Sequence, residues 1–325
     1  MMFNGPKFPR NLMVEPTNFC NAQCPTCPTG SGRLKRPRGF MSETLFAQLV
    51  DECSPHGTKF TLWNFGEPFL HPQIFEFIER AHTSGISVKV STNGTAFYTR
   101  RKIDRLLECG VEKVIIGIDG ATPETHAKFR RGVDFAAILA GLSYLSTSMN
   151  GTSLPFQLVI QMLAFRHNES EIDRVRDLAI SFGASFELKT ANLQMVEGLD
   201  YEDWLPITEK YKRYHWNPER KGWYLKDAGR SFCSYIENGF AGFVVNWDGR
   251  ATPCCRDYQS EWVIGDLNHQ RLEEIWLGDP LNELRGAIRQ DYRSVSICRQ
   301  CAVDINKRPL ETAPTGRLEA KRDVR

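Results

Sequence analysis

The chain has 325 residues, 41% of them hydrophobic, which is enough for one large α/β domain and a smaller one, and which excludes an intrinsically disordered chain. Its 41 basic and 39 acidic residues give a net charge of +2, so no global field attracts nucleic acid. No stretch approaches 18 continuous apolar residues, and the N-terminal segment has no signal-peptide pattern. We therefore expect a cytoplasmic protein with no membrane or nucleic-acid partner.

Six short apolar runs predict buried strands, at residues 11–16, 59–65, 86–92, 111–119, 156–163 and 184–190. Amphipathic helices are predicted between them, because apolar residues recur there at helical spacing. Their predicted N-caps are Ser42, Thr99 and Asn168, and their predicted terminating glycines are Gly57, Gly85, Gly110 and Gly183. Strands alternating with helices indicate parallel pairing, in either an open doubly wound sheet or a partial barrel.

The alternation stops near residue 195, so we divide the chain into a domain at 1–195, a connector at 196–232 and a second domain with a tail at 233–325. The connector has no clear period, and little regular structure is expected there. Asp248 and Gly249 lie between two β-rich runs and predict a hairpin. The helix predicted at 271–289 should break near Pro280.

Ten cysteines in clustered spacings indicate metal binding rather than disulfides, because cytoplasmic thiols stay reduced. Cys20, Cys24 and Cys27 follow the first predicted strand, at the end of the sheet where α/β proteins build their sites. A zinc site with a fourth ligand from elsewhere is one reading. A four-iron cluster with one iron left without a protein ligand is the other, and such an iron could bind a substrate or cofactor.

The CxxxCxxC spacing after the first strand of a six-fold β/α chain resembles the radical SAM superfamily, and the resemblance extends over residues 11–190. It implies an α/β fold, a partial (β/α)6 TIM barrel, in which Cys20, Cys24 and Cys27 hold a four-iron four-sulfur cluster. In that family the open iron binds S-adenosylmethionine. Its reductive cleavage gives a 5′-deoxyadenosyl radical, which abstracts hydrogen from an unactivated C–H bond.

Three further segments agree with the family's cofactor motifs, although each alone could be ordinary turn chemistry. The segment "NFGEP" resembles GGEP with Phe65 in place of the first glycine, and "IGIDG" resembles S-[IL]-D-G with Gly117 in place of serine. The segment "STNG" resembles the part that approaches the ribose and the methionyl carboxylate. The resemblance implies the following cofactor-binding residues: Gly66, Glu67, Pro68, Ser91, Asn93 and Asp119.

A second cysteine group resembles the twitch variant of the family's SPASM extension, in which a single auxiliary four-iron cluster is fully ligated by protein. Its members are Cys233, Cys254, Cys298 and Cys301, with Gly249 and Cys254 in a GxxxxC spacing. Four thiolates could instead hold a structural zinc ion. The cofactors implied are therefore two 4Fe-4S clusters and S-adenosylmethionine, with an electron donor such as flavodoxin or ferredoxin as a partner.

The remaining cysteines are assigned separately. Cys53 and Cys109 lie on apolar helix faces and are expected in the core. Cys255 adjoins a proposed ligand, and it is either a spare thiol or a catalytic hydrogen-atom donor to a substrate radical. The basic run from Arg33 to Arg38 is expected to be a solvated loop, with binding of an anionic group of the substrate or cofactor as the alternative.

Relatives with one auxiliary cluster act on small natural products, so the resemblance implies a sugar or aminocyclitol substrate that is epimerised or dehydrogenated by two electrons. Modification of a ribosomally made peptide is the alternative. The 19 residues before Cys20 leave little room for a fused peptide-recognition domain, which weighs against it. A non-catalytic zinc or iron-sulfur scaffold would leave the GEP and TNG segments unexplained.

Overall fold

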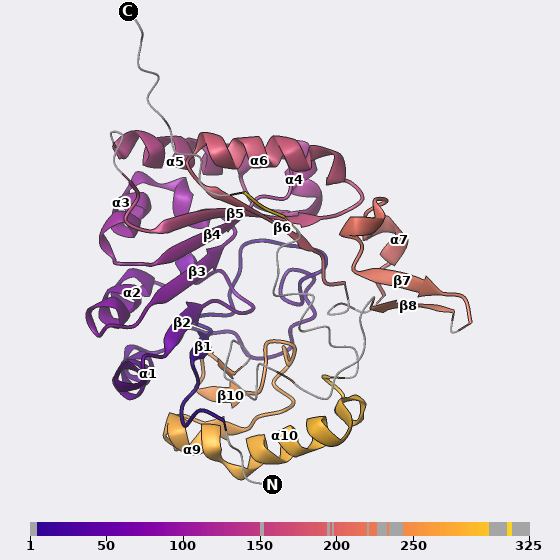
Figure 1. Ribbon diagram of the computed structural model, residues 1–325. Coiled ribbons are helices and arrows are strands. Elements are labelled where there is room, and N and C mark those ends of the chain that lie inside the picture. The colour runs from indigo at the N-terminus through magenta and orange to yellow at the C-terminus, as the bar shows by residue number, and fades with distance from the viewer. Residues whose placement is uncertain are drawn as a thin grey trace, which may run out of the picture.

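The computed structural model describes residues 5–149, 153–193, 196, 198–219, 221–225, 233, 243–298 and 311–313. Six parallel strands lie in sequential order in one sheet: β1 Asn11–Val14, β2 Lys59–Leu62, β3 Val88–Thr92, β4 Lys113–Gly117, β5 Gln157–Ala164 and β6 Ser185–Thr190. Helices cover the outer face of this curved sheet (Figure 1). They are α1 Glu43–Cys53, α2 Ile74–Thr83, α3 Arg100–Glu108, α4 Pro123–Phe129, α5 Phe135–Ser148 and α6 Ile172–Ser181. The fold is a partial (β/α)6 TIM barrel, as predicted.

Side-chain caps and glycines mark the ends of several helices. Ser42 and Thr99 cap α1 and α3, because their side chains accept hydrogen bonds from Leu45 N and Lys102 N. The prediction for Asn168 was wrong, since its side chain gives α6 no cap hydrogen bond and instead accepts from Phe165 N and donates to Asp119 O. The predicted terminating glycines all have positive φ, for example 78° at Gly85.

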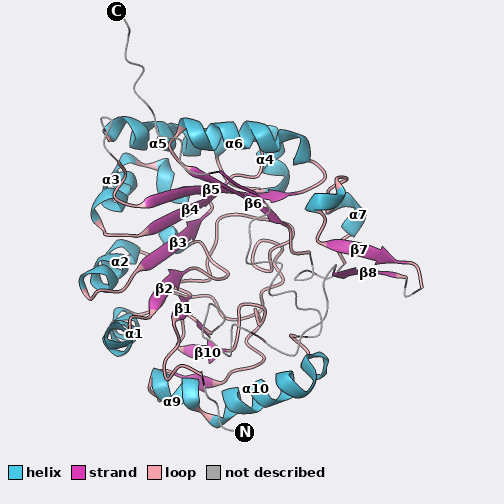
Figure 2. Ribbon diagram, in the orientation of Figure 1, coloured by secondary structure: helices cyan, strands magenta, loops and turns pink. Residues whose placement is uncertain are grey.

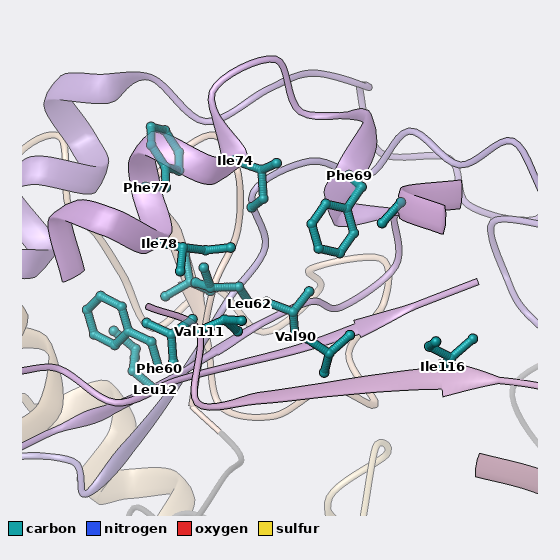
Figure 3. Close-up of a cluster of buried hydrophobic side chains, with 14 of the residues drawn as sticks. Leu12, Phe60, Leu62, Phe69, Ile74, Phe77, Ile78, Val90, Val111 and Ile116 are labelled. Carbon is teal, nitrogen blue, oxygen red and sulfur yellow. The ribbon is translucent and has the colours of Figure 1, made fainter. Parts of the chain in front are cut away.

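The core lies between the sheet and its helices. Figure 3 shows Ile74, Phe77 and Ile78 of α2 in one cluster with Phe60 and Leu62 of β2, and all five side chains are buried. Burial of each such side chain stabilises the fold by about 1.5–3 kcal/mol. The rings of Phe46 and Phe77 stack with centroids 4.1 Å apart, so α1 and α2 pack on one another as well as on the strands. Cys53 and Cys109 are buried in this core, as expected.

The C-terminal part extends the barrel sheet at its β1 edge. Strand β9 (Val244–Val245) pairs in parallel with β1 and forms the predicted hairpin with β10 (Arg250–Thr252), to which β11 (Gly265–Asp266) adds. At the opposite edge, β12 (Glu311–Ala313) pairs antiparallel with β6. The sheet therefore runs across the proposed domain boundaries, which remain a prediction.

Two helices follow the hairpin. They are α9 (Leu272–Leu277) and α10 (Asp279–Asp291), with Pro280 in the first turn of α10. The predicted break near Pro280 is confirmed, because proline is tolerated at a helix start but not inside one. Figure 1 shows both helices beside the β1 edge of the barrel.

The described part of the connector is more ordered than expected. It contains α7 (Tyr201–Trp204) and a two-stranded sheet of β7 (Tyr214–Asn217) and β8 (Gly222–Leu225), which Figure 2 shows beside the barrel. Trp216 and Trp223 are partners across this hairpin, with ring centroids 5.6 Å apart. The expectation failed because four-residue strands are too short to show a period, and cross-strand aromatic pairs stabilise them. Within the described residues, no helix is both long and apolar enough to cross a membrane.

Candidate active site

A cavity of about 410 Å³ opens at the carboxyl ends of the barrel strands. Side chains from the loops after β1, β2 and β3 line it, together with residues from β5, β6 and the segments that follow them. Seven of the residues implied by the family resemblance line it: Cys20, Cys24, Cys27, Gly66, Glu67, Ser91 and Asn93. Pro68 and Asp119 are buried but do not line this cavity. Three loops that are far apart in the chain therefore converge where the sequence placed the cofactor.

The cysteine loop presents its three thiols to this cavity without disulfides. Cys27 N donates to Cys24 O at 3.1 Å, which makes a tight turn between these two cysteines. Among the described residues, no three Cys, His, Asp or Glu side chains are grouped as ligands of a single ion. The three cysteines share one cavity.

Burial dominates the chemistry of these thiols. It raises the pKa of Cys20 to about 12 and that of Cys24 to about 11, with the positive charge of Arg130 opposing the rise at Cys24. An iron centre binds thiolates and deprotonates a coordinating thiol outright. The donor set of three soft sulfur atoms in a partly open cavity therefore fits an iron-sulfur cluster with one open iron.

Glu67 joins the loops after β2 and β3. Its carboxylate is almost fully buried and accepts hydrogen bonds from Thr92 Oγ1 at 2.8 Å, Asn93 N at 2.7 Å and Phe69 N at 3.1 Å. Burial raises the pKa of Glu67 even though these donors favour its charged form. Gly66 beside it packs against the cysteine loop, since a Cβ there would lie 2.0 Å from Thr17 O.

Asn93 ties the third loop to the first. Its Nδ2 donates to Asn21 Oδ1 at 2.8 Å and lies 3.9 Å from Cys20 Sγ, while its Oδ1 accepts from Thr95 N at 3.0 Å. Ser91 lies two residues earlier, also on the cavity wall. Both residues are where a cofactor bound at the three cysteines could reach them.

Asp119 has a different position from the one expected of a cofactor contact. Its Oδ2 accepts from Arg130 Nε at 2.6 Å and its Oδ1 from Leu163 N at 2.6 Å, so both oxygens are engaged by the protein. Its backbone oxygen accepts from Asn168 Nδ2 at 3.0 Å. Asp119 thereby holds Arg130, whose side chain lines the cavity.

Arg130 is a cavity residue that the sequence reasoning missed. Its guanidinium lies near Cys24 and over Gly117, where a Cβ would come within 2.2 Å of Nη2. The glycine in place of the family's serine was the available signal. A missing side chain at Gly117 makes room for the guanidinium.

The second cysteine group is partly described. Cys254 and Cys255 follow β10, and Arg256 Nε donates to Ile297 O at 3.2 Å, which brings this loop beside Cys298. Cys233 lies close enough to Cys255 to affect its thiol electrostatically. Cys301 lies outside the described residues. These contacts link the loop after β10 to the segments that carry Cys233 and Cys298, and the shared ligand set remains a prediction.

Cys255 does not line the cavity. Burial raises the pKa of its thiol, and its neighbours belong to the second cysteine group. The role of hydrogen-atom donor therefore has no support from the cavity lining, and this position favours the spare-thiol reading.

The two cysteine groups are connected through Arg36. The expectation that the whole basic run is solvated was wrong, because Arg36 is buried and forms a bidentate ion pair with Glu15 at 3.0 and 2.8 Å. Its Nε also donates to Tyr258 O at 2.7 Å. The rings of Tyr258 and Phe65 meet edge to face at 5.9 Å. The loop after Cys254 is thereby docked on the loops that line the cavity.

Comparison with known proteins agrees with this arrangement. The radical SAM superfamily profile matches residues 14–179, and the profile of the SPASM iron-sulfur cluster-binding domain matches residues 233–302. An AdoMet-dependent heme synthase of Methanosarcina barkeri is 32% identical over 178 residues, 54% of this chain and 48% of that protein. The chain thus spans about half the length of the curated relatives it matches.

Two solved structures show the same fold at low identity. BtrN in complex with AdoMet and 2-DOIA has a TM-score of 0.59 at 18% identity, over 91% of this chain and 94% of BtrN. Streptococcus suis SuiB bound to S-adenosylmethionine has a TM-score of 0.65 at 13% identity, over 92% of this chain and 73% of SuiB. The two matching domains imply two 4Fe-4S clusters and S-adenosylmethionine as cofactors. The chain belongs to the radical SAM superfamily and carries a C-terminal SPASM-type iron-sulfur domain.

Proposed function

We propose that this radical SAM enzyme abstracts hydrogen from a C–H bond of a small natural product of the sugar or aminocyclitol type, leading to epimerisation or two-electron dehydrogenation. The observation that carries the proposal is the convergence of Cys20, Cys24, Cys27, Glu67 and Arg130 on one cavity at the strand ends. With cluster and S-adenosylmethionine bound, this site supplies a 5′-deoxyadenosyl radical.

Different residues of the chain are proposed to bind the first cluster and S-adenosylmethionine. Cys20, Cys24 and Cys27 are the proposed ligands of the first cluster. Arg130 is the proposed partner of the methionyl carboxylate, because guanidinium groups bind carboxylates well and Asp119 holds this one beside the thiols. Glu67 fixes the backbone at Asn93, so the loop after β3 keeps its place on the wall.

The second centre is proposed to use Cys233, Cys254, Cys298 and Cys301. Its ligand loop is docked on the first cysteine loop through Arg36 and Tyr258. The family chemistry needs a one-electron donor, for which flavodoxin or ferredoxin is proposed.

The outcome of the reaction is tested separately. If the enzyme is an epimerase with Cys255 as donor, Cys255→Ala should stop epimerisation while hydrogen abstraction continues. If epimerisation is unchanged in that variant, Cys255 is not the donor.

Peptide modification is the second candidate function, because SuiB bound to its precursor peptide SuiA has a TM-score of 0.65 with this chain at 13% identity. Deuterium transfer into 5′-deoxyadenosine from labelled sugars or from labelled peptides would distinguish the two substrate classes.

The first test measures iron, sulfide and zinc per chain in protein purified without oxygen, followed by 5′-deoxyadenosine formation with dithionite. Two cubane clusters give about eight irons and eight sulfides. Cys24→Ala should lose about four irons and the cleavage activity, whereas the matched control Cys109→Ala removes a buried thiol outside the cavity and should retain both. About four irons with one zinc would make the second centre structural. Zinc without iron would contradict the proposal.

A further inference from the structure

The ends of β6 and β7 bring two cationic side chains to the cavity. Lys189 lies near the end of β6 and Arg213 directly precedes β7, and both line the cavity. Tyr214 joins these segments, since its hydroxyl accepts from Leu193 N at 3.0 Å and donates to Asn192 Oδ1 at 3.1 Å. Lys189 and Arg213 thus both contribute to the wall of the same cavity, on segments that Tyr214 connects.

Lys189 shares its counter-charge with a second lysine. Glu187 accepts from Lys113 Nζ at 3.1 Å on one oxygen and from Gln161 Nε2 at 3.2 Å on the other. Lys189 Nζ is 3.7 Å from the same carboxylate, which is beyond hydrogen-bond distance. Within the described residues, two ammonium groups thus face one carboxylate.

Because Lys189 is partly buried, its charge is destabilised when it shares one carboxylate with Lys113. Its side chain is 29% exposed, and burial together with the charge of Lys113 lowers its pKa although Glu187 opposes this. A partly buried cation is stabilised by a nearby anion and by hydrogen-bond acceptors. An oxyanion in the cavity would supply both to Lys189.

We propose that the substrate carries an anionic group, a carboxylate or a phosphate monoester, that Lys189 and Arg213 bind. The inference rests on the proposed function and narrows its substrate class to a sugar acid or a sugar phosphate. Ammonium and guanidinium groups together form charge-assisted hydrogen bonds to such oxyanions. An aminocyclitol would place its own ammonium groups against this wall and is disfavoured by like-charge repulsion.

The test uses calorimetric titration of the reconstituted holoenzyme with S-adenosylmethionine, without oxygen and at constant ionic strength. The probes are glucuronate, glucose 6-phosphate, glucose and glucosamine, which share a ring and differ in charge. At least one anionic probe should bind about 10-fold or more tightly than glucose, the effect of one charge-assisted hydrogen bond, and glucosamine should bind more weakly. The tighter of the two anions identifies a carboxylate or a phosphate as the group bound.

Substitutions of Lys189 test whether this residue causes the tighter binding of anions. Lys189→Met should lower the affinity for the preferred anion about 10-fold or more, and Lys189→Arg should restore most of it. The control Lys59→Met removes an exposed lysine at the amino end of β2 and should bind the anion as the wild type does. Anions that bind no more tightly than glucose, or that bind Lys189→Met equally well, would overturn the inference. Formation of 5′-deoxyadenosine by the wild type tests the proposed function independently.

Discussion

Arg36 connects the loop after β1 with the loop after β10 through Glu15 and Tyr258. Its partner Glu15 is fully buried at the end of β1 and also accepts from Asn64 Nδ2 at 3.0 Å and from Phe65 N at 3.4 Å. Two buried charges with satisfied hydrogen bonds are tolerated, but one alone is not. The pair therefore positions the loops after β1 and β2 relative to each other and to Tyr258.

Replacement of Arg36 should be strongly destabilising. Arg36→Met leaves the Glu15 carboxylate buried without its cation, so we expect the free energy of unfolding to fall by about 3–5 kcal/mol. Urea unfolding without oxygen measures it. Lys35→Met removes the same charge from an exposed side chain of the same loop and should change stability by less than about 0.5 kcal/mol. Equal losses in the two variants would contradict a buried ion pair.

At the scale of elements, α9 holds the C-terminal part against the barrel through Trp276. The indole is fully buried, its Nε1 donates to Pro6 O at 2.8 Å, and its ring meets Phe243 edge to face at 5.8 Å. Arg285 of α10 lies over the same ring, with Cζ 4.4 Å from the centroid. One side chain thus connects the N-terminal segment, the start of β9 and α10.

Truncation of this side chain should loosen the hairpin that leads to Cys254. Trp276→Ala should cost about 3–5 kcal/mol, because it leaves a large cavity and removes the hydrogen bond to Pro6. Hydrogen exchange of the β9 and β10 amides should accelerate. Leu277→Ala, at a side chain that is 37% exposed, is the control and should leave exchange there unchanged. If β9 and β10 exchange at the wild-type rate in Trp276→Ala, α9 does not hold the hairpin.

At the scale of the whole molecule, buried histidines make stability depend on pH. Burial lowers the pKa of His126 from 6.5 to about 4, and it also lowers the pKa values of His71 and His167. The folded state therefore keeps these rings neutral at pH values where the unfolded chain protonates them. Burial of Glu67 raises its pKa and acts in the opposite direction above its unfolded value of 4.5.

The histidine contribution should be fully present above pH 6.5 and be lost as the pH falls toward 4. For His126 the loss is at most about 3 kcal/mol, from a shift of roughly 2.5 units at 1.36 kcal/mol each. Urea unfolding between pH 7 and 4 measures the slope. His126→Asn should make it shallower, while the exposed His269→Asn should not alter it. An unchanged slope in His126→Asn would show that the pKa of this ring is the same in the folded and unfolded states.

The sequence determined the features that local patterns encode. Hydrophobic periodicity records which face of a segment is buried, so six β/α units, the hairpin at Gly249 and the break at Pro280 could be predicted. The spacing of Cys20, Cys24 and Cys27 on one loop is equally local. The short segments around Glu67 and Asn93 placed both residues at strand ends, and the structure brings them to the cavity with the cysteines.

Only the tertiary structure decided which distant charges meet. Arg130 lies 106 positions after Cys24, Arg36 belongs to a run that reads as solvated, and Asp119 proved to hold an arginine. The local sequence around a charged side chain does not identify its partner, because the partner lies on a loop that converges from a different strand. The wall formed by Lys189 and Arg213 exists for the same reason: the fold, not the sequence spacing, places the two cations on one cavity.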